Sequence, residues 1–291
     1  MKKMSLKMTP QNAPYYFMAP GIILFGVFGA YPIIASFLYS FQEKIGSKAT
    51  SFIGIDNYIK AFKDTVFLLS LKNIFIIFLM HAPLMIFMSL ILAHILNSKT
   101  TKFKNGFRTA FFLPNVTNAV AYTMLFKILL SNDGVVNGIL SRLNISPIQW
   151  LSDQTSAKWV ISIMIIWRWL GYNMVIFLAA MQSITEDVYE AADIDGASKL
   201  QQFFSITVPL MKNPIIFTIV MTVSGTLNLF AESQLLVQGG PNYGTFTPAL
   251  EIYTVAWKQF NFGYASALSY IVSLITIVIA FVQFNLGKEK D

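Results

Sequence analysis

The stretch YEAADIDGASKLQQFFSITVPL, residues 189–210, is polar and rich in acids, yet it lies between two long apolar runs. Five acids fall early in a predicted short helix, where they complement the positive end of its dipole: Glu186, Asp187, Glu190, Asp193 and Asp195. Gly196 should end or bend this helix, and residues 199–207 should form a second helical turn or two before Pro209. The phenylalanines of the second turn favour a docking surface over the alternative, an ordinary solvated helix.

The rest of the chain has the composition of a membrane protein. Hydrophobic residues make up 55% and charged residues 12% of the 291 residues, whereas a soluble domain carries about a quarter charged residues. Six continuous apolar runs, each about 20 residues or more, are long enough to cross a bilayer as helices. They cover residues 15–41, 71–96, 107–130, 157–181, 214–237 and 265–286. We predict an all-α integral membrane protein whose residues 1–291 form a single transmembrane domain, with residues 183–213 as a loop.

The orientation of these spans is predicted from lysine and arginine in short loops. The loop between the second and third runs carries four basic residues and no acid, and the N-terminal segment carries three lysines: Lys99, Lys102, Lys104, Arg108, Lys2, Lys3 and Lys7. Both belong in the cytoplasm by this rule. An even number of spans then places the C-terminal tail and the 189–210 stretch on the cytoplasmic side. The 42–70 loop also has lysines, but acids accompany them.

Several function classes receive no support. The net charge is +7, but the basic residues are scattered over helix ends and do not form the dense basic face that nucleic-acid binding needs. There is no cysteine, and His81 and His94 would lie on nearly opposite faces of one helix, so we predict no metal site. Phosphate-loop, nucleophile-elbow and metalloprotease motifs are absent from the sequence, which argues against an enzyme, including a membrane-embedded hydrolase. If ATP is used, another chain must hydrolyse it.

The acidic stretch also carries a spaced signature. An EAA triplet is followed by glycine, then by isoleucine and a Leu-Pro-like pair: Glu190, Ala191, Ala192, Gly196, Ile206, Val208 and Pro209. This pattern, with valine in place of leucine, resembles the signature loop of permease subunits in bacterial binding-protein-dependent ABC importers. The stretches FIGIDNYIKAF, LVQGGPNYGT and GYASALS resemble the sugar-importer branch, specifically the first-type subunits similar to maltose and glycerol-phosphate permeases.

The resemblance implies a type I importer permease fold in the bacterial plasma membrane, with both termini cytoplasmic. It implies a heterodimer with a second permease, two cytoplasmic ATPase subunits that hold ATP and Mg²⁺, and an extracytoplasmic solute-binding protein. This chain itself would bind no cofactor. The residues expected to couple to the ATPase are Glu190, Ala191, Ala192, Asp195, Gly196, Ile206 and Pro209. The outer loop, expected to contact the binding protein or to help close an outer gate, is Gly239, Gly240 and Pro241, which is also a good turn.

A hydrated sugar needs polar partners along its path. Candidates on the third to fifth spans are Asn115, Asn118, Tyr122, Trp167, Arg168, Tyr172, Asn173, Thr222, Thr226, Asn228 and Glu232. The resemblance to the maltose permease narrows the expected path to Asn115, Ala119, Trp167, Gly171, Met174, Thr222, Gly225 and Thr226. The charged membrane residues Arg168 and Glu232 are expected to pair, in a structural, gating or substrate role.

The substrate is expected to be a neutral sugar. A phosphate would favour several cations along the path, and only Arg168 and Lys127 are available there. Glycerol phosphate or a sugar alcohol remains an alternative for the same architecture. A secondary transporter is a further alternative, although such proteins normally show inverted repeats, and no internal repeat is visible here.

Overall fold

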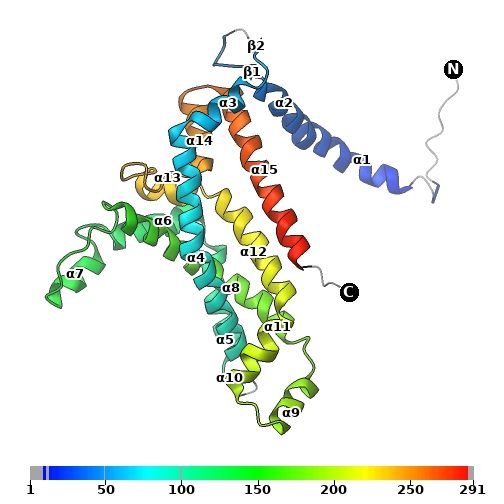
Figure 1. Ribbon diagram of the computed structural model, residues 1–291, viewed down its shortest axis with the longest axis vertical. Helices are drawn as coiled ribbons and strands as arrows, with labels where there is room; N and C mark the ends of the chain where they lie inside the picture. The colour runs from blue at the N-terminus through cyan, green and yellow to red at the C-terminus, as the bar shows by residue number, and fades with distance from the viewer. Residues whose placement is uncertain (1–8, 11–12, 49, 99, 288–291) are drawn as a thin grey trace. The chain divides into compact units, whose positions relative to one another are not determined.

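The computed structural model describes residues 9–10, 13–48, 50–98 and 100–287 (Figure 1). The lysines at positions 2, 3, 7 and 99 and the tail after Gly287, on which the predicted orientation partly rests, lie outside these residues. The chain divides into two compact units. One comprises residues 1–62 and 254–270, and the other comprises residues 63–253 and 271–291.

The first unit begins with an apolar helical run that passes through α1 (Ala13–Phe25), a π-helical segment (Gly26–Ala30) and α2 (Tyr31–Ser40). A two-residue hairpin, β1 (Gln42–Glu43) with β2 (Ser51–Phe52), follows α2 and is antiparallel with Gln42 opposite Phe52. The amide of Asn57, on α3 (Asp56–Lys63), donates to the carbonyls of Ser40 and Gln42 at 3.0 Å each. This amide satisfies backbone groups that the short strands leave unpaired.

The second unit is organised around two long helices, α4 (Thr65–Asn97) and α8 (Gln154–Met181), which pack along each other (Figure 1). Each helix starts at an aspartate whose carboxylate accepts two backbone N–H groups: Asp64 caps α4 and Asp153 caps α8. Between them, the hydroxyl of Ser89 donates to the carbonyl of Leu170 at 3.0 Å. Helix α5 (Lys104–Val116) also packs against α8.

The predicted third span, residues 107–130, is two helices in the structure. Helix α5 ends at Val116 and α6 (Ala119–Leu129) begins after Asn118, whose extended backbone and side-chain bond to the Val120 N–H form a helix cap. The polar residues Asn115, Thr117 and Asn118 mark this break within the apolar run. A short helix, α7 (Val135–Arg142), follows.

The segment after α8 consists of short helices. Helix α9 (Glu186–Ile194) is followed by a helical run made of α10 (Lys199–Gln202), a π-helical segment (Phe203–Thr207) and α11 (Val208–Leu210). The chain then bends by 67° into α12 (Lys212–Leu227). The predicted fifth span, residues 214–237, therefore ends at Leu227, and α13 (Ala231–Val237) is a separate helix. Helix α14 (Pro248–Tyr253), a π-helical segment (Thr254–Lys258) and α15 (Phe262–Gly287) complete the chain.

The described residues contain four helical stretches that are long and apolar enough to cross a membrane, or five if the bent pair counts as one span. The four are 13–40, 65–97, 154–181 and 262–285. The predicted all-α fold is confirmed. The structure does not contain six continuous spans in the described part of the chain. The third run is divided at residues 117–118, and the fifth run, which follows the 67° bend, is interrupted after Leu227.

Gly171 on α8 generates a stability prediction. A Cβ at this position would overlap the backbone of Phe111 on α5, so the two helices approach too closely for any side chain there. We expect Gly171→Ala to lower the thermal midpoint of the detergent-solubilised protein, with a cost of about 1–3 kcal/mol from overpacking.

Gly106→Ala is the matched control, because a Cβ at Gly106 meets nothing within 4 Å and alanine favours the helix. Differential scanning fluorimetry in one detergent compares the two variants. Equal midpoints for Gly171→Ala and Gly106→Ala would contradict the close helix crossing.

Candidate functional site

The predicted turn at Gly196 joins α9 to α10. Gly196 has φ +76°, and the N–H groups of Ala197 and Gly196 donate to the carbonyls of Ala192 (2.9 Å) and Asp193 (3.1 Å). These two bonds form the Schellman motif that ends many helices. Open space surrounds the missing Cβ of Gly196, so the left-handed backbone, and not crowding within this chain, accounts for the glycine.

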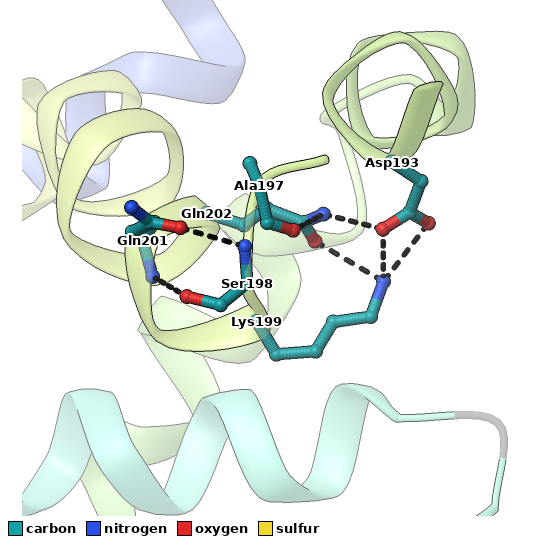
Figure 2. Close-up of polar contacts among 6 residues, drawn as sticks. All are labelled: Asp193, Ala197, Ser198, Lys199, Gln201 and Gln202. Atoms are coloured by element: carbon teal, nitrogen blue, oxygen red, sulfur yellow. Dashed lines mark hydrogen bonds and ion pairs between the residues drawn. The ribbon is translucent and has the colours of Figure 1, made fainter. Parts of the chain in front are cut away.

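A second cap starts the following helix immediately. The N–H of Ser198 donates to the side chain of Gln201 at 2.8 Å, and the N–H of Gln201 donates to the Ser198 hydroxyl at 3.3 Å, as Figure 2 shows. This reciprocal pair is a capping box. The two caps leave one residue, Ala197, between Gly196 and Ser198, so the reversal of the chain is tightly defined.

Asp193 holds the two helices together (Figure 2). Its carboxylate accepts from Lys199 Nζ at 2.8 and 2.9 Å and from Gln202 Nε2 at 2.5 Å. The hydrogen bond from Lys199, followed by that from Gln202, lowers the pKa of Asp193 below its ordinary value. A lowered folded-state pKa means that this carboxylate stabilises the hairpin above about pH 3.9, and that the contribution is lost as the pH falls through the lowered pKa.

We name residues 186–210 the α9–α11 hairpin. Its inner side is fixed to the bundle: Phe203 is buried in one cluster with Phe177, Met181 and Met211, and its ring centroid lies 4.9 Å from that of His94. The Tyr189 hydroxyl lies 2.9 Å from Thr207 Oγ1 and links α9 to the second helical run. The hairpin is therefore a rigid part of the second unit.

The outer side of the hairpin exposes both polar and apolar side chains. Of the predicted coupling residues, Glu190, Ala191, Asp195, Gly196 and Pro209 are exposed, Ile206 is half-buried and Ala192 is buried. Ile194 is 86% exposed and Leu200 is 69% exposed. The sequence prediction did not single out Ile194, which lies two residues before Gly196; a large apolar side chain this exposed is typical of a contact surface.

Replacing Asp193 tests how the hairpin is held. Asp193→Asn removes the charge that Lys199 pairs with, so we expect faster backbone hydrogen exchange over residues 193–203. Asp195→Asn should leave this exchange unchanged, because Asp195 caps α9 through its backbone N–H and the loss of an acid at a helix C-terminus is favourable. Similar exchange in both variants, measured by mass spectrometry, would rule out Asp193 as the link.

A cavity of about 490 Å³ lies in the second unit, within the size range of small-molecule sites. Helices α4, α8, α12 and α13 and residues 228–230 enclose it. Its lining includes the predicted residues Arg168, Tyr172, Asn173, Thr222, Gly225, Thr226, Asn228 and Glu232. It also includes His81 and Trp169, which the sequence prediction did not place on the path.

The predicted pairing of Arg168 with Glu232 is present. Arg168 Nη1 lies 3.5 Å from Glu232 Oε1 and 3.1 Å from the hydroxyl of Tyr122, and that hydroxyl donates to Glu232. The three side chains come from α8, α13 and α6. Tyr122 and Glu232 are both buried, and their contacts with Arg168 fix the position of the guanidinium.

The remaining predicted path residues do not line this cavity. Trp167 packs its ring against Tyr122 and Phe126, Gly171 lies at the α5–α8 crossing, and Met174 is fully buried in the cluster that holds Phe203. Asn115 and Ala119 are half-buried on either side of the break between α5 and α6, and the Asn115 Nδ2 atom is buried without a hydrogen-bond partner. Their predicted substrate contacts stay predictions.

The predicted outer loop is held firmly by neighbouring side chains. Asn73 on α4 donates to the carbonyls of Tyr243 (2.7 Å) and Phe246 (3.1 Å), and Ser233 on α13 donates to that of Thr245 (2.6 Å). Gly239 has φ +79°, and a Cβ there would press on Phe246. The Gly240–Pro241 peptide is cis. The loop is thus a fixed structural feature next to α4 and α13.

Comparison with known proteins places these features in a family. Residues 70–289 match the model of the binding-protein-dependent transport system inner membrane component. The chain is 41% identical over 281 residues to the lactose transport system permease protein LacF of Rhizobium radiobacter, covering 95% of this chain and 94% of that protein. It is 31% identical over 278 residues to the arabinooligosaccharides transport system permease protein AraP of Bacillus subtilis (strain 168), covering 94% and 88%.

A solved structure shares the fold. A chain of a bacterial ABC transporter involved in the import of the acidic polysaccharide alginate superposes with a TM-score of 0.84 at 24% identity, covering 95% of this chain and 96% of that one. A second crystal structure, of the bacterial alginate ABC transporter in complex with an alginate pentasaccharide-bound periplasmic protein, gives a TM-score of 0.82 at 23% identity. The match over residues 70–289 shows that this chain belongs to the inner membrane components of binding-protein-dependent transport systems.

Proposed function

We propose that this chain is the transmembrane subunit of an ATP-driven carbohydrate importer in the bacterial plasma membrane. The observation that carries the proposal is the similarity along nearly the whole chain to permease proteins named for lactose and for arabinooligosaccharides. The cavity supports it, since its mainly apolar lining also includes hydroxyl, amide and aromatic side chains, which together suit a saccharide. The chain supplies half of the path, and a second permease subunit supplies the other half.

The α9–α11 hairpin is the proposed contact with the ATPase subunits. A rigid element with exposed Glu190, Ile194 and Leu200 offers both charge and apolar area to a partner, and its fixed base carries movement into the bundle. In this proposal both termini and the hairpin are cytoplasmic, two ATPase subunits bind ATP and Mg²⁺, and an extracytoplasmic binding protein delivers the sugar. This chain hydrolyses nothing itself.

The cavity favours a neutral sugar over glycerol phosphate. Glu232 neutralises Arg168, and Lys127 donates instead to the carbonyl of Leu235 at 3.3 Å, away from the cavity lining. An anionic substrate would meet no uncompensated cation among the charged residues that line the cavity in the described part of the chain. A sugar alcohol fits the same groups and is a second candidate.

Uptake of labelled saccharides by proteoliposomes tests the function. The complete transporter, made of both permeases, the ATPase and the binding protein, is expected to accumulate a neutral disaccharide or oligosaccharide only with ATP and the binding protein present. Uptake driven by an ion gradient without ATP would instead indicate a secondary transporter. Accumulation of glycerol phosphate, with no saccharide, would overturn the substrate class.

Two substitutions test the hairpin. We expect Gly196→Asp and Glu190→Lys to abolish transport and to reduce co-purification of the ATPase at least tenfold, while the permease still inserts in the membrane, because both positions are exposed and make no packing contact that insertion requires. Arg142→Glu, an exposed charge reversal on α7, is the matched control and should retain the ATPase. Normal uptake by both hairpin variants would refute the coupling role.

A further inference from the structure

Helix α3 in the first unit exposes its apolar side and buries a polar one. Asn57 is buried, whereas Ile55, Ile59 and Phe62 are 60%, 44% and 67% exposed. At about 100° per residue, these three apolar side chains fall within a sector of about 60°, opposite Asn57. A helix of a soluble core has the reverse arrangement, with its apolar stripe facing inward. The exposed stripe therefore indicates an apolar environment outside this chain.

The buried side of α3 is attached to the end of the first apolar helical run by polar contacts. The Asn57 amide donates to the carbonyls of Ser40 and Gln42 at 3.0 Å each, and the Tyr58 hydroxyl lies 2.7 Å from Ser40 Oγ. The Tyr58 ring also lies 5.6 Å from that of Phe41, between centroids. Because Ser40 is the last residue of α2, these contacts fix the position and the rotation of α3 at that end of the run.

This attachment places α3 at a boundary of the membrane. The run over residues 13–40 is long and apolar enough to cross a bilayer, and 0% of its most apolar 18-residue window is buried in the described chain. Its 28 residues extend over about 42 Å, whereas the bilayer is about 40–45 Å thick with its headgroups. A helix attached to the last residue of such a run lies at the level of the headgroups when the run crosses the membrane.

The charges near the stripe suit phospholipid headgroups. Residues 42–63 contain four lysines and two acids, so this loop carries an excess of positive charge. One of these lysines, Lys60 on α3, has its Nζ atom 4.2 Å from the centroid of the Tyr264 ring. Lysines at the surface of a membrane are attracted to the phosphates of its lipids. Contact with lipid accounts for these lysines on a loop that is predicted to lie outside the cytoplasm.

Exposed aromatic side chains lie at the same end of the first unit. The N–H of Gly46, in the loop between β1 and β2, donates to the carbonyl of Phe260 at 2.8 Å and holds the two segments together. Phe260 and Trp257 are 54% and 61% exposed, and Phe52 on β2 is 78% exposed. Tryptophan is enriched where a membrane meets water, because its ring is apolar and its N–H is polar. Aromatic side chains and lysines together are typical of such an interface.

We propose that α3 is an interfacial helix that binds the phospholipid surface of the membrane. Ile55, Ile59 and Phe62 insert at the boundary between headgroups and acyl chains, and the neighbouring lysines contact lipid phosphates. The inserted helix holds the end of the first span at the bilayer surface. In the orientation proposed above, this surface is the outer leaflet. The inference goes beyond the transport function and applies whichever solute is carried.

The competing occupant of the stripe is the extracytoplasmic binding protein. The membrane is favoured because α3 is attached to the last residue of a span and because lysines and a tryptophan lie at the same end. The two occupants differ in one measurable property, since lipid surrounds the stripe at all times and a binding protein covers it only when added.

Single-cysteine labelling tests this placement, and the chain has no cysteine of its own to interfere. Ile59→Cys and Phe62→Cys, each labelled with bimane, are reconstituted as complete transporters in phospholipid vesicles. We expect lipids that carry a nitroxide near the headgroup to quench both labels at least threefold more than a label at Asp56→Cys. Asp56 is the matched control, because it is an exposed residue on the polar side of the same helix. Iodide in the water should show the reverse order.

Three results would overturn the proposal. Equal quenching by iodide at all three positions would show that the stripe lies in water. A label at Ile59→Cys or Phe62→Cys that lipid does not quench, and that iodide reaches only until the binding protein is added, would identify a docking face for that protein. Labels that neither quencher reaches at any stage would show that another subunit covers the stripe. Either labelled position is sufficient for the decision, so poor folding of one variant leaves the test intact.

Discussion

The packing of α4 along α8 is the interaction on which the rest of the second unit depends. It is made of apolar side chains together with the Ser89–Leu170 hydrogen bond, and both helices are started by aspartate caps. One end of this pair carries the cluster of Phe177, Met181 and Phe203 that anchors the hairpin. His81 and Arg168, farther along the same helices, line the cavity. The hairpin and the cavity are thus built on the same pair of helices.

Features set by local chemistry were predicted well from the sequence. The short helix, the turn at Gly196 and the family resemblance are confirmed, because caps and signature spacings act within a few residues. The prediction that all five acids lie early in the helix is wrong, since Asp193 is in the last turn of α9 and Asp195 is its C-cap. The break at Asn118 was missed, although an asparagine before an apolar run is a readable cap signal. The role of Asp193 was also missed, since its partner Lys199 is reached only after the chain reverses.

The cavity was predicted only in part, for a different physical reason. Long helices that are apolar on nearly every face give no sequence signal for which face turns inward. Of the predicted path residues, Thr222, Gly225 and Thr226 line the cavity, whereas Gly171 and Met174 lie on faces of α8 that pack against other helices. His81 was considered only as a metal ligand. The rotation of each helix is decided by tertiary packing, which residue types alone do not reveal.

The bend at Met211 has a mechanical consequence. Met211 is buried in the cluster that anchors the hairpin, so packing fixes the bend between α11 and α12. Helix α12 extends from that corner to Leu227 over 16 residues, a length of about 24 Å. A tilt of about 5° at the corner would displace its far end by about 2 Å. Thr222 and Thr226 lie toward that end and line the cavity, so such a tilt would change the width of the cavity.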